Sequence, residues 1–219
     1  MFVGHYGAAF AGKTAAKIIP LWILFLAVQL VDIAWSFFIL LGIERVRLVP
    51  GFTKLSPLAL DYMPYSHGLI ASLIWAVGTG ALYVLTIRNA GRVAAFAVLA
   101  AAVFSHWVLD FFVHTPDLPI WDNEMKVGLG LWNRPEIALP LEAAALVLGF
   151  LIYIRTTVAK GAVGQWAPWV VLALLVGVHV FALYQPVPPT PQDFAITALI
   201  SYVVIALLAY WLDRTRAPA

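Results

Sequence analysis

Ionisable side chains recur every four residues between His106 and His114. The segment reads Ser105-His106-Trp-Val-Leu-Asp110-Phe-Phe-Val-His114, and residues four apart lie on the same face of a helix. His106, Asp110 and His114 therefore form one polar stripe on an otherwise apolar helix. Imidazole and carboxylate groups are ligands of divalent transition metals, and ionisable groups at membrane depth face a cavity or a partner. The stripe favours a metal-binding or proton-handling site over ordinary hydrogen bonds between helices.

The composition is that of a polytopic membrane protein. Of 219 residues, 63% are hydrophobic and only 11% are charged, and the mean hydropathy is +0.93, far from a soluble domain. We expect an all-α bundle that forms a single integral membrane domain over residues 1–219. The chain has no cysteine, so any metal must be held by His, Asp or Glu. The net charge of +2 is spread over loops, which argues against nucleic acid and leaves membrane lipids as partners.

Apolar stretches of membrane length follow a short opening segment. Each is close to the roughly 20 residues that cross the hydrocarbon core of a bilayer, and runs this long and uniformly apolar are helices, not barrel strands. The opening segment lacks the cleavage site of a signal peptide, so we predict a short helix over 3–17 that packs into the protein. Six transmembrane helices are predicted at about 21–43, 67–87, 92–114, 136–154, 167–184 and 194–212.

The distribution of Lys and Arg predicts that both chain termini are cytoplasmic. Eight basic residues fall on the N-terminal side of the predicted spans and five on the other side, and cytoplasmic loops carry the excess of positive charge. The long loops at about 44–66 and 115–135 then face the periplasm or exterior. The eight are Lys13, Lys17, Arg88, Arg92, Arg155, Lys160, Arg214 and Arg216, and the five are Arg45, Arg47, Lys54, Lys126 and Arg134.

Counting helical rise, about 1.5 Å per residue, places several ionisable residues at one depth. Four of them come out roughly 20 Å from the cytoplasmic end of their helix. By the same count, Asp110 and His67 lie higher, at roughly 27 and 31 Å, so helix tilt would be needed to bring them level. The residues that share the first level are His5, Asp32, His106 and Glu142.

Other ionisable residues receive weaker interpretations. Glu142 has no basic residue on its own span before Arg155, so we expect its partner to be a metal, His5 or His106. His179 has no acidic neighbour on its own helix and is interpreted as a hydrogen-bonded core histidine. Carboxylates of the outer loops are interpreted as solvated, and they are Asp61, Asp117, Asp122, Glu124 and Glu136.

Four short blocks in about the first 125 residues carry a family resemblance. The blocks are Gly4-His5, Leu30-Val-Asp32, Tyr65-Ser66-His67-Gly-Leu-Ile and Ser105-His106-Trp-Val-Leu-Asp110. They resemble the bacterial inner-membrane family of membrane-bound metal-dependent hydrolases, which is distantly similar to the zinc-dependent phospholipase C and S1–P1 nuclease superfamily. In that superfamily a His-x-x-x-Asp pair on one helix bridges metal ions. This chain departs from the family pattern at Ala34, where a second acid is common, and at Tyr62-Met-Pro-Tyr65, where His-Arg-Gly is common.

The resemblance implies a metal-dependent hydrolase of the bacterial inner membrane. Its substrate would be a lipid or a lipid-linked (phospho)ester, reached in the outer half of the bilayer. The ligand types favour zinc, with manganese or iron as alternatives. The metal ligands would be His5, Asp32, His67, His106 and Asp110, with His114 and Glu142 as catalytic acid or base.

Three alternatives stay open at this point. A proton- or ion-coupled transporter would also place His and carboxylate groups at one depth, but it needs a polar path to both sides. A bis-histidine haem protein would use facing histidines without the neighbouring carboxylates. A family member with a purely structural role would keep the fold and lack the chemistry.

Overall fold

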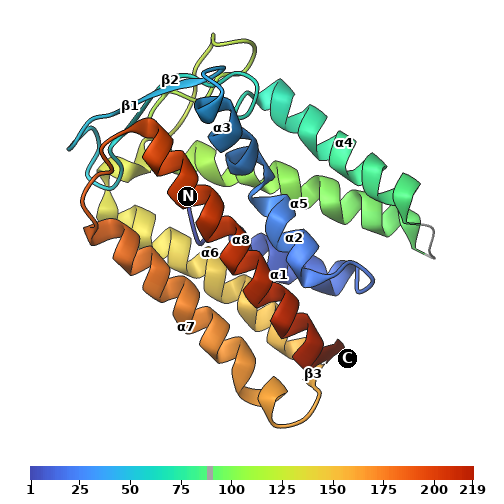
Figure 1. Cartoon of the computed structure of the whole chain (residues 1–219). Helices are drawn as coiled ribbons and strands as arrows, with labels where there is room; N and C mark the ends of the chain where they lie inside the picture. Colours follow the sequence, from blue (N-terminus) through green and yellow to red (C-terminus); the bar gives the residue numbers. More distant parts are fainter. Residues whose placement is uncertain (88–90) are drawn as a thin grey trace.

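The computed structural model describes residues 1–87 and 91–219, and Figure 1 shows the chain as a bundle of helices. Arg88, one of the basic residues used to predict orientation, lies outside the described residues. The α-helices of the described part are α1 (His5–Ala15), α2 (Leu21–Val28), α3 (Leu30–Leu40), α4 (Leu69–Thr86), α5 (Arg92–Val113), α6 (Pro135–Arg155), α7 (Val163–Tyr184) and α8 (Pro191–Thr215), with a 3-10 turn η1 (Leu131–Asn133) before α6.

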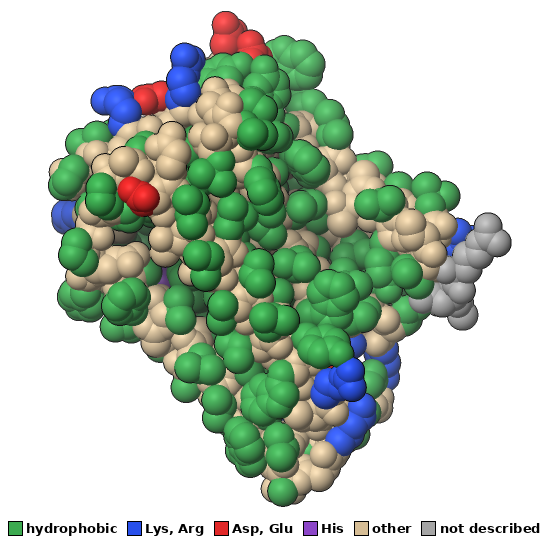
Figure 2. All heavy atoms as spheres, viewed as in Figure 1, with side chains coloured by type: hydrophobic (Ala, Val, Ile, Leu, Met, Phe, Trp, Pro, Cys, Tyr) green, Lys and Arg blue, Asp and Glu red, His purple; other side chains and the backbone are tan. Residues whose placement is uncertain are grey.

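Helices long and apolar enough to cross a membrane make up most of the bundle. Within the described residues, α4 to α8 each meet this condition alone, and α2 with α3 meets it as a pair bent by 54°. The chain is therefore a multi-pass helical membrane protein, with a sixth span if the bent pair crosses as one. Hydrophobic side chains cover most of the surface in Figure 2, and Lys and Arg gather toward its ends.

The predicted first span at 21–43 is wrong in one respect, because it is not a continuous helix. It breaks at Gln29, whose φ of −106° and ψ of 4° separate α2 from α3. Beside the break, the carbonyl oxygen of Val28 accepts a hydrogen bond from His106 Nδ1 at 2.7 Å. A polar side chain that takes up a backbone carbonyl in this way is a common cause of a helix kink, and here the side chain comes from α5.

Two small antiparallel sheets lie at opposite ends of the bundle (Figure 1). At one end β1 (Arg45–Leu48) pairs with β2 (Leu58–Tyr62) in the predicted outer loop. The Arg47 guanidinium donates to Asp61 at 2.7 and 2.8 Å and lowers the pKa of that carboxyl. At the other end β3 (Thr157–Ala159) pairs with β4 (Arg216–Pro218), which ties the end of α6 to the C-terminal residues.

Helix α1 lies inside the bundle and crosses α6 at very short range. It falls within the range 3–17 predicted for a short packed helix. A Cβ atom added to Gly149 would lie 2.0 Å from the carbonyl oxygen of Gly7, and one added to Gly7 would lie 2.0 Å from that of Ala145. Small residues let helix backbones approach this closely in membrane proteins. The crossing brings His5 of α1 and Glu142 of α6 into the interior.

Buried aromatic rings fill the bundle on the side of the α1–α2 turn. The Phe10 ring lies 5.1 Å from Phe25, 5.6 Å from Phe150 and 5.2 Å from Tyr153, measured between ring centroids. All four side chains are buried. This apolar core supports the cluster of ionisable residues that lies further along the same helices, toward β1 and β2.

Replacing Gly149 with Ala should destabilise the bundle. The added methyl group would collide with the Gly7 backbone, and overpacking of this kind costs about 1–3 kcal/mol. Gly177→Ala in α7 is the matched control, because an added Cβ there meets nothing within 4 Å and Ala favours helix more than Gly. Thermal unfolding in detergent should show a lower midpoint for Gly149→Ala alone, and equal midpoints would contradict the close crossing.

Candidate metal centre

Ionisable side chains from distant parts of the sequence meet inside the bundle. α1 supplies His5, α3 supplies Asp32, α5 supplies His106 and Asp110, and the turn before α4 supplies His67. The four residues other than Asp32 are buried, and Asp32 is half-buried. The structure thus brings together the whole set of residues that the sequence predicts as metal ligands.

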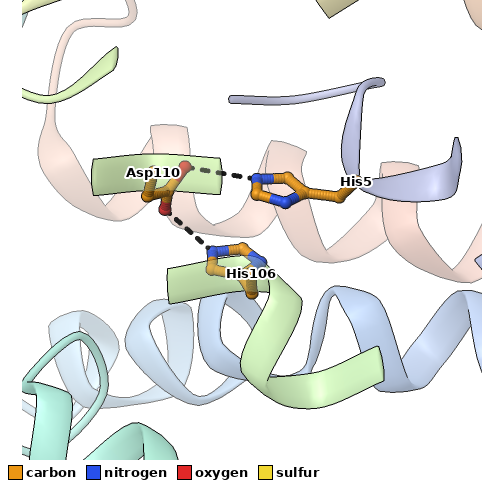
Figure 3. A group of neighbouring side chains, drawn as sticks. All are labelled: His5, His106 and Asp110. Carbon is orange, nitrogen blue, oxygen red and sulfur yellow. Dashed lines mark ion pairs between the residues drawn. The ribbon is translucent and has the colours of Figure 1, made fainter. Parts of the chain in front are cut away.

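Asp110 lies at the centre of this cluster. Its Oδ1 is 3.3 Å from Nε2 of His5, and its Oδ2 is 3.1 Å from Nε2 of His106, as Figure 3 shows. Oδ2 also lies 3.5 Å from Nε2 of His114 and 3.8 Å from Nε2 of His67. The N-terminal ammonium group of Met1 donates to Oδ1 and forms an ion pair with it. The two oxygens of one buried carboxylate therefore face different sets of partners.

Asp32 forms a second focus of the cluster. Its Oδ1 is 3.2 Å from Nε2 of His67 and 3.5 Å from Nε2 of His106. Its Oδ2 accepts a hydrogen bond from the Tyr202 hydroxyl at 3.0 Å. The ring of His106 also stacks on that of His5, with centroids 4.0 Å apart and planes 6° apart. His106 therefore contacts both carboxylates and links the two foci.

The hydrogen bond of His106 to the Val28 carbonyl fixes the tautomer of its ring. A carbonyl oxygen can only accept, so Nδ1 must carry the proton. In the neutral ring Nε2 then holds a lone pair, and it points toward Asp110 and Asp32. Histidines that ligate metals show this arrangement, with one nitrogen donating to a carbonyl or carboxylate and the other facing the ion.

His67 is oriented through a chain of two further side chains. Ser66 Oγ donates to Glu44 Oε2 at 2.6 Å and lies 2.8 Å from His67 Nδ1, so it accepts the proton of Nδ1. Glu44 also accepts the backbone N–H groups of Tyr65 at 2.8 Å and Ser66 at 2.9 Å. Burial raises the pKa of the Glu44 carboxyl, and these hydrogen bonds offset part of that effect.

His114 is oriented by a carboxylate of the loop that follows α5. Its Nδ1 lies 2.9 Å from Oδ1 of Asp117, and its Nε2 faces Asp110. Its ring packs against Trp132, with centroids 4.1 Å apart. Asp117 is buried, which corrects the interpretation of this residue as solvated. The predicted catalytic residue His114 thus joins the cluster with its Nδ1 already engaged.

Ring nitrogens of three histidines face carboxylate oxygens at close range. The Nε2 atoms of His67, His106 and His114 approach carboxylate oxygens while their Nδ1 protons are used elsewhere. Two acceptors repel each other unless a proton or a cation lies between them. Two groups have ligand atoms within 4.8 Å of one another, as a metal site requires: His5, His106 and Asp110, and Asp32, His67 and His106.

Glu142, the other predicted catalytic residue, has partners that differ from those expected. Its Oε1 accepts the backbone N–H groups of Phe2 at 2.6 Å and Gly4 at 3.2 Å. Its Oε2 lies 3.8 Å from Nε2 of His179. The expected partner was a metal, His5 or His106. His179, interpreted from sequence as a core histidine, is therefore the imidazole within ion-pair distance of Glu142 in the described structure.

A cavity of about 260 Å³ connects Glu142 and His179 with the cluster. We call it the central cavity. Its polar wall is formed by Asp32, His67, Asp110, His114, Glu142, His179 and Tyr202. Its apolar wall includes Trp35, Leu58, Leu60, Leu139, Val178, Phe181 and Phe194. The ionisable residues thus lie at the surface of a largely apolar space.

Sequence analysis missed three residues that hold the cluster in place. Glu44 orients His67 through Ser66. Asp117 contacts Nδ1 of His114, and Tyr202 donates to Asp32. Asp117 could have been noticed because it follows His114 by three residues. Glu44 and Tyr202 gave no such signal, since they are far from their partners in sequence.

Comparison with known proteins adds no assignment. No protein-family model, no curated protein and no solved structure matches the chain. The resemblance to membrane-bound metal-dependent hydrolases therefore stays a prediction from four sequence blocks. A proposal for the function therefore rests on the geometry of the cluster.

Ser66→Ala should destabilise the protein more than Ser105→Ala. Each serine precedes a histidine of the cluster, but Ser105 Oγ donates to the Ala102 carbonyl of its own helix. Loss of the Ser66 hydroxyl leaves buried polar atoms of Glu44 and His67 without that partner, which costs about 1–3 kcal/mol. Unfolding in denaturant measures both variants, and equal losses would show that Ser66 does not support the cluster.

Proposed function

We propose that this chain is a metal-dependent hydrolase of a membrane, with a divalent metal ion bound in the cluster. The observation that carries the proposal is the convergence of the Nε2 atoms of His5, His67 and His106 on two carboxylates. A cation there would turn repulsion between acceptors into coordination. The proposed ligands are His5, Asp32, His67, His106 and Asp110.

The donor set suits a transition metal of borderline hardness. Nitrogen and oxygen ligands without thiolate fit zinc, and also manganese or iron. The contacts of Nδ1 with Val28 and Ser66 are of the kind that orient metal-binding histidines, here His106 and His67. Asp110 presents one oxygen to His5 and the other to His106, so both of its oxygens could serve as ligands.

The geometry supports this proposal better than the alternatives. The His5 and His106 rings stack at 4.0 Å, which leaves no room for a haem macrocycle between them. A transporter needs a polar path through the bundle. On the side of the α1–α2 turn, the interior is instead filled by the buried rings of Phe10, Phe25, Phe150 and Tyr153. These rings leave no polar path on that side, which favours a reaction site over a transport path.

The residues around the central cavity have separate proposed roles in hydrolysis. A bound divalent ion would lower the pKa of a coordinated water and would offset negative charge on an acyl or phosphoryl oxygen. His114, held by Asp117, is placed in the wall to accept a proton from water. Glu142 and His179 form a second acid–base pair in the same wall, placed to return a proton to the leaving group.

The proposed substrate is a lipid or a lipid-linked ester. The central cavity lies among helices of membrane-spanning length, and much of its wall is apolar. A molecule that enters it needs an apolar part to match this wall. We propose the bacterial inner membrane as the location, on the family resemblance, with the cavity in the half of the bilayer toward β1 and β2.

The C-terminus should lie in the cytoplasm. It shares its end of the bundle with the α1–α2 turn, because Lys17 donates to the Ala219 carbonyl at 2.6 Å, and basic residues are concentrated at that end. Because Met1 is buried beside Asp110, this prediction concerns the α1–α2 turn and the C-terminus and does not concern the N-terminus. Reporter fusions after Ala219 and within 115–135 measure this, and a periplasmic C-terminus would contradict it.

Removal of a proposed ligand should lower the metal content of the purified protein. His106→Ala and Asp110→Asn each remove a ligand atom that the site needs, and metal affinity follows ligand number and geometry. His179→Ala is the matched histidine control, because His179 has no contact with the cluster in the described structure. Elemental analysis after purification without chelators should give metal in wild type and His179→Ala. Absence of metal from all of these proteins would refute the proposed site.

A further inference from the structure

We infer that the central cavity takes an amphiphile with an uncharged, hydrogen-bond-donating polar end, such as an acyl ester with free hydroxyl groups, in preference to a phosphate-headed lipid. This inference rests on the proposed function for the reaction that follows binding. Binding itself depends only on the wall of the cavity, so it can be tested with or without a metal ion.

The apolar part of the wall defines one end of the ligand. It combines side chains from α3, β2, α6, α7 and α8. Burial of an acyl chain against such side chains is favourable because it removes apolar surface from water. The ligand therefore carries an apolar chain that fits beside Trp35, Phe181 and Phe194.

The charges of the wall disfavour an anionic head group. Asp32, Asp110 and Glu142 line the cavity, and no Lys or Arg side chain does so among the residues that the structure describes. The N-terminal ammonium of Met1 is paired with Asp110, so Asp32 and Glu142 keep the wall of the metal-free cavity acidic. Proteins bind phosphate with Arg, Lys and metal ions, which this wall lacks when no metal is bound. Lys54 lines a neighbouring cavity of about 440 Å³ and does not belong to this wall.

The hydrogen-bonding capacity of the wall calls for donors on the ligand. The Tyr202 hydroxyl donates to Asp32 at 3.0 Å, Ser201 donates to the Thr197 carbonyl at 2.9 Å, and Thr197 donates to the Asp193 carbonyl at 2.8 Å. These hydroxyl groups have used their protons and retain acceptor lone pairs. Together with the carboxylates, they leave the cavity rich in acceptors, which ligand hydroxyl groups would satisfy.

Trp35 supplies a donor for the carbonyl oxygen of such a ligand. It lines the cavity, and its ring lies 6.4 Å from that of His67 and 6.0 Å from that of Phe194. Its buried Nε1–H has no hydrogen-bond partner among the described residues, and an unpaired buried donor is costly. An ester carbonyl would provide the missing acceptor next to the proposed metal ligands.

Two probes with the same chain length test the inference: 1-decanoylglycerol and decyl phosphate. Binding to the full chain in nanodiscs is measured by native mass spectrometry, before and after chelator treatment. In the chelator-treated protein the glycerol ester should bind about tenfold or more tightly than the phosphate, because desolvating an unpaired charge is expensive. Equal binding, tighter binding of the phosphate to the chelator-treated protein, or binding of neither probe would overturn the inference.

Variants place the binding in the central cavity. Ala198→Phe fills the cavity and should abolish binding of 1-decanoylglycerol, whereas Leu207→Phe on the exposed side of α8 should leave it unchanged. Trp35→Phe keeps an aromatic ring and removes the N–H donor. It should weaken binding of the glycerol ester and leave binding of the phosphate unchanged. Unchanged binding in Ala198→Phe would overturn the inference.

The metal site and the ligand preference can fail separately. His106→Ala should lose metal and still prefer the glycerol ester, because His106 does not line the cavity in the described structure. A wild-type protein without metal that keeps this preference would refute the hydrolase and leave the binding inference standing. If the purified protein contains metal but prefers decyl phosphate after chelator treatment, the binding inference is refuted and the proposed metal site stands.

Discussion

The buried carboxylate of Asp110 is the constraint on which the rest of the site depends. A charge inside a membrane bundle must be paired, and here imidazole nitrogens and the N-terminal ammonium of Met1 surround it. Each of His67, His106 and His114 uses its Nδ1 elsewhere, on Ser66, Val28 and Asp117 respectively. The Nε2 atoms are thereby turned toward the carboxylates, and the proposed metal ion would offset the charge of this group.

The fold supplies these contacts by departing from straight, uniformly spaced helices. The break at Gln29 frees the Val28 carbonyl for His106, and the glycine crossing of α1 and α6 lets a short helix carry His5 into the interior. The same crossing brings the amides of Phe2 and Gly4 onto Glu142. Local irregularities in α2–α3 and α1 are therefore part of how the site is built.

Sequence analysis could predict the parts of the site that follow from spacing along one helix. The stripe of His106, Asp110 and His114 depends on a four-residue repeat, and the common depth of His5 and Asp32 depends on counting rise from one turn. The break at Gln29 was not predictable in this way, because its partner His106 is more than 70 residues away. Glu44, Tyr202 and the pairing of Glu142 with His179 likewise depend on contacts between distant segments.

The central claim is that the cluster coordinates a metal ion through imidazole. X-ray absorption spectroscopy of the protein stripped with a chelator and reloaded with one equivalent of zinc tests this most directly. The account predicts nitrogen and oxygen ligands at about 2.0–2.2 Å with several imidazoles in the first coordination shell. Zinc that is not retained, or that is retained without imidazole ligands, would contradict it.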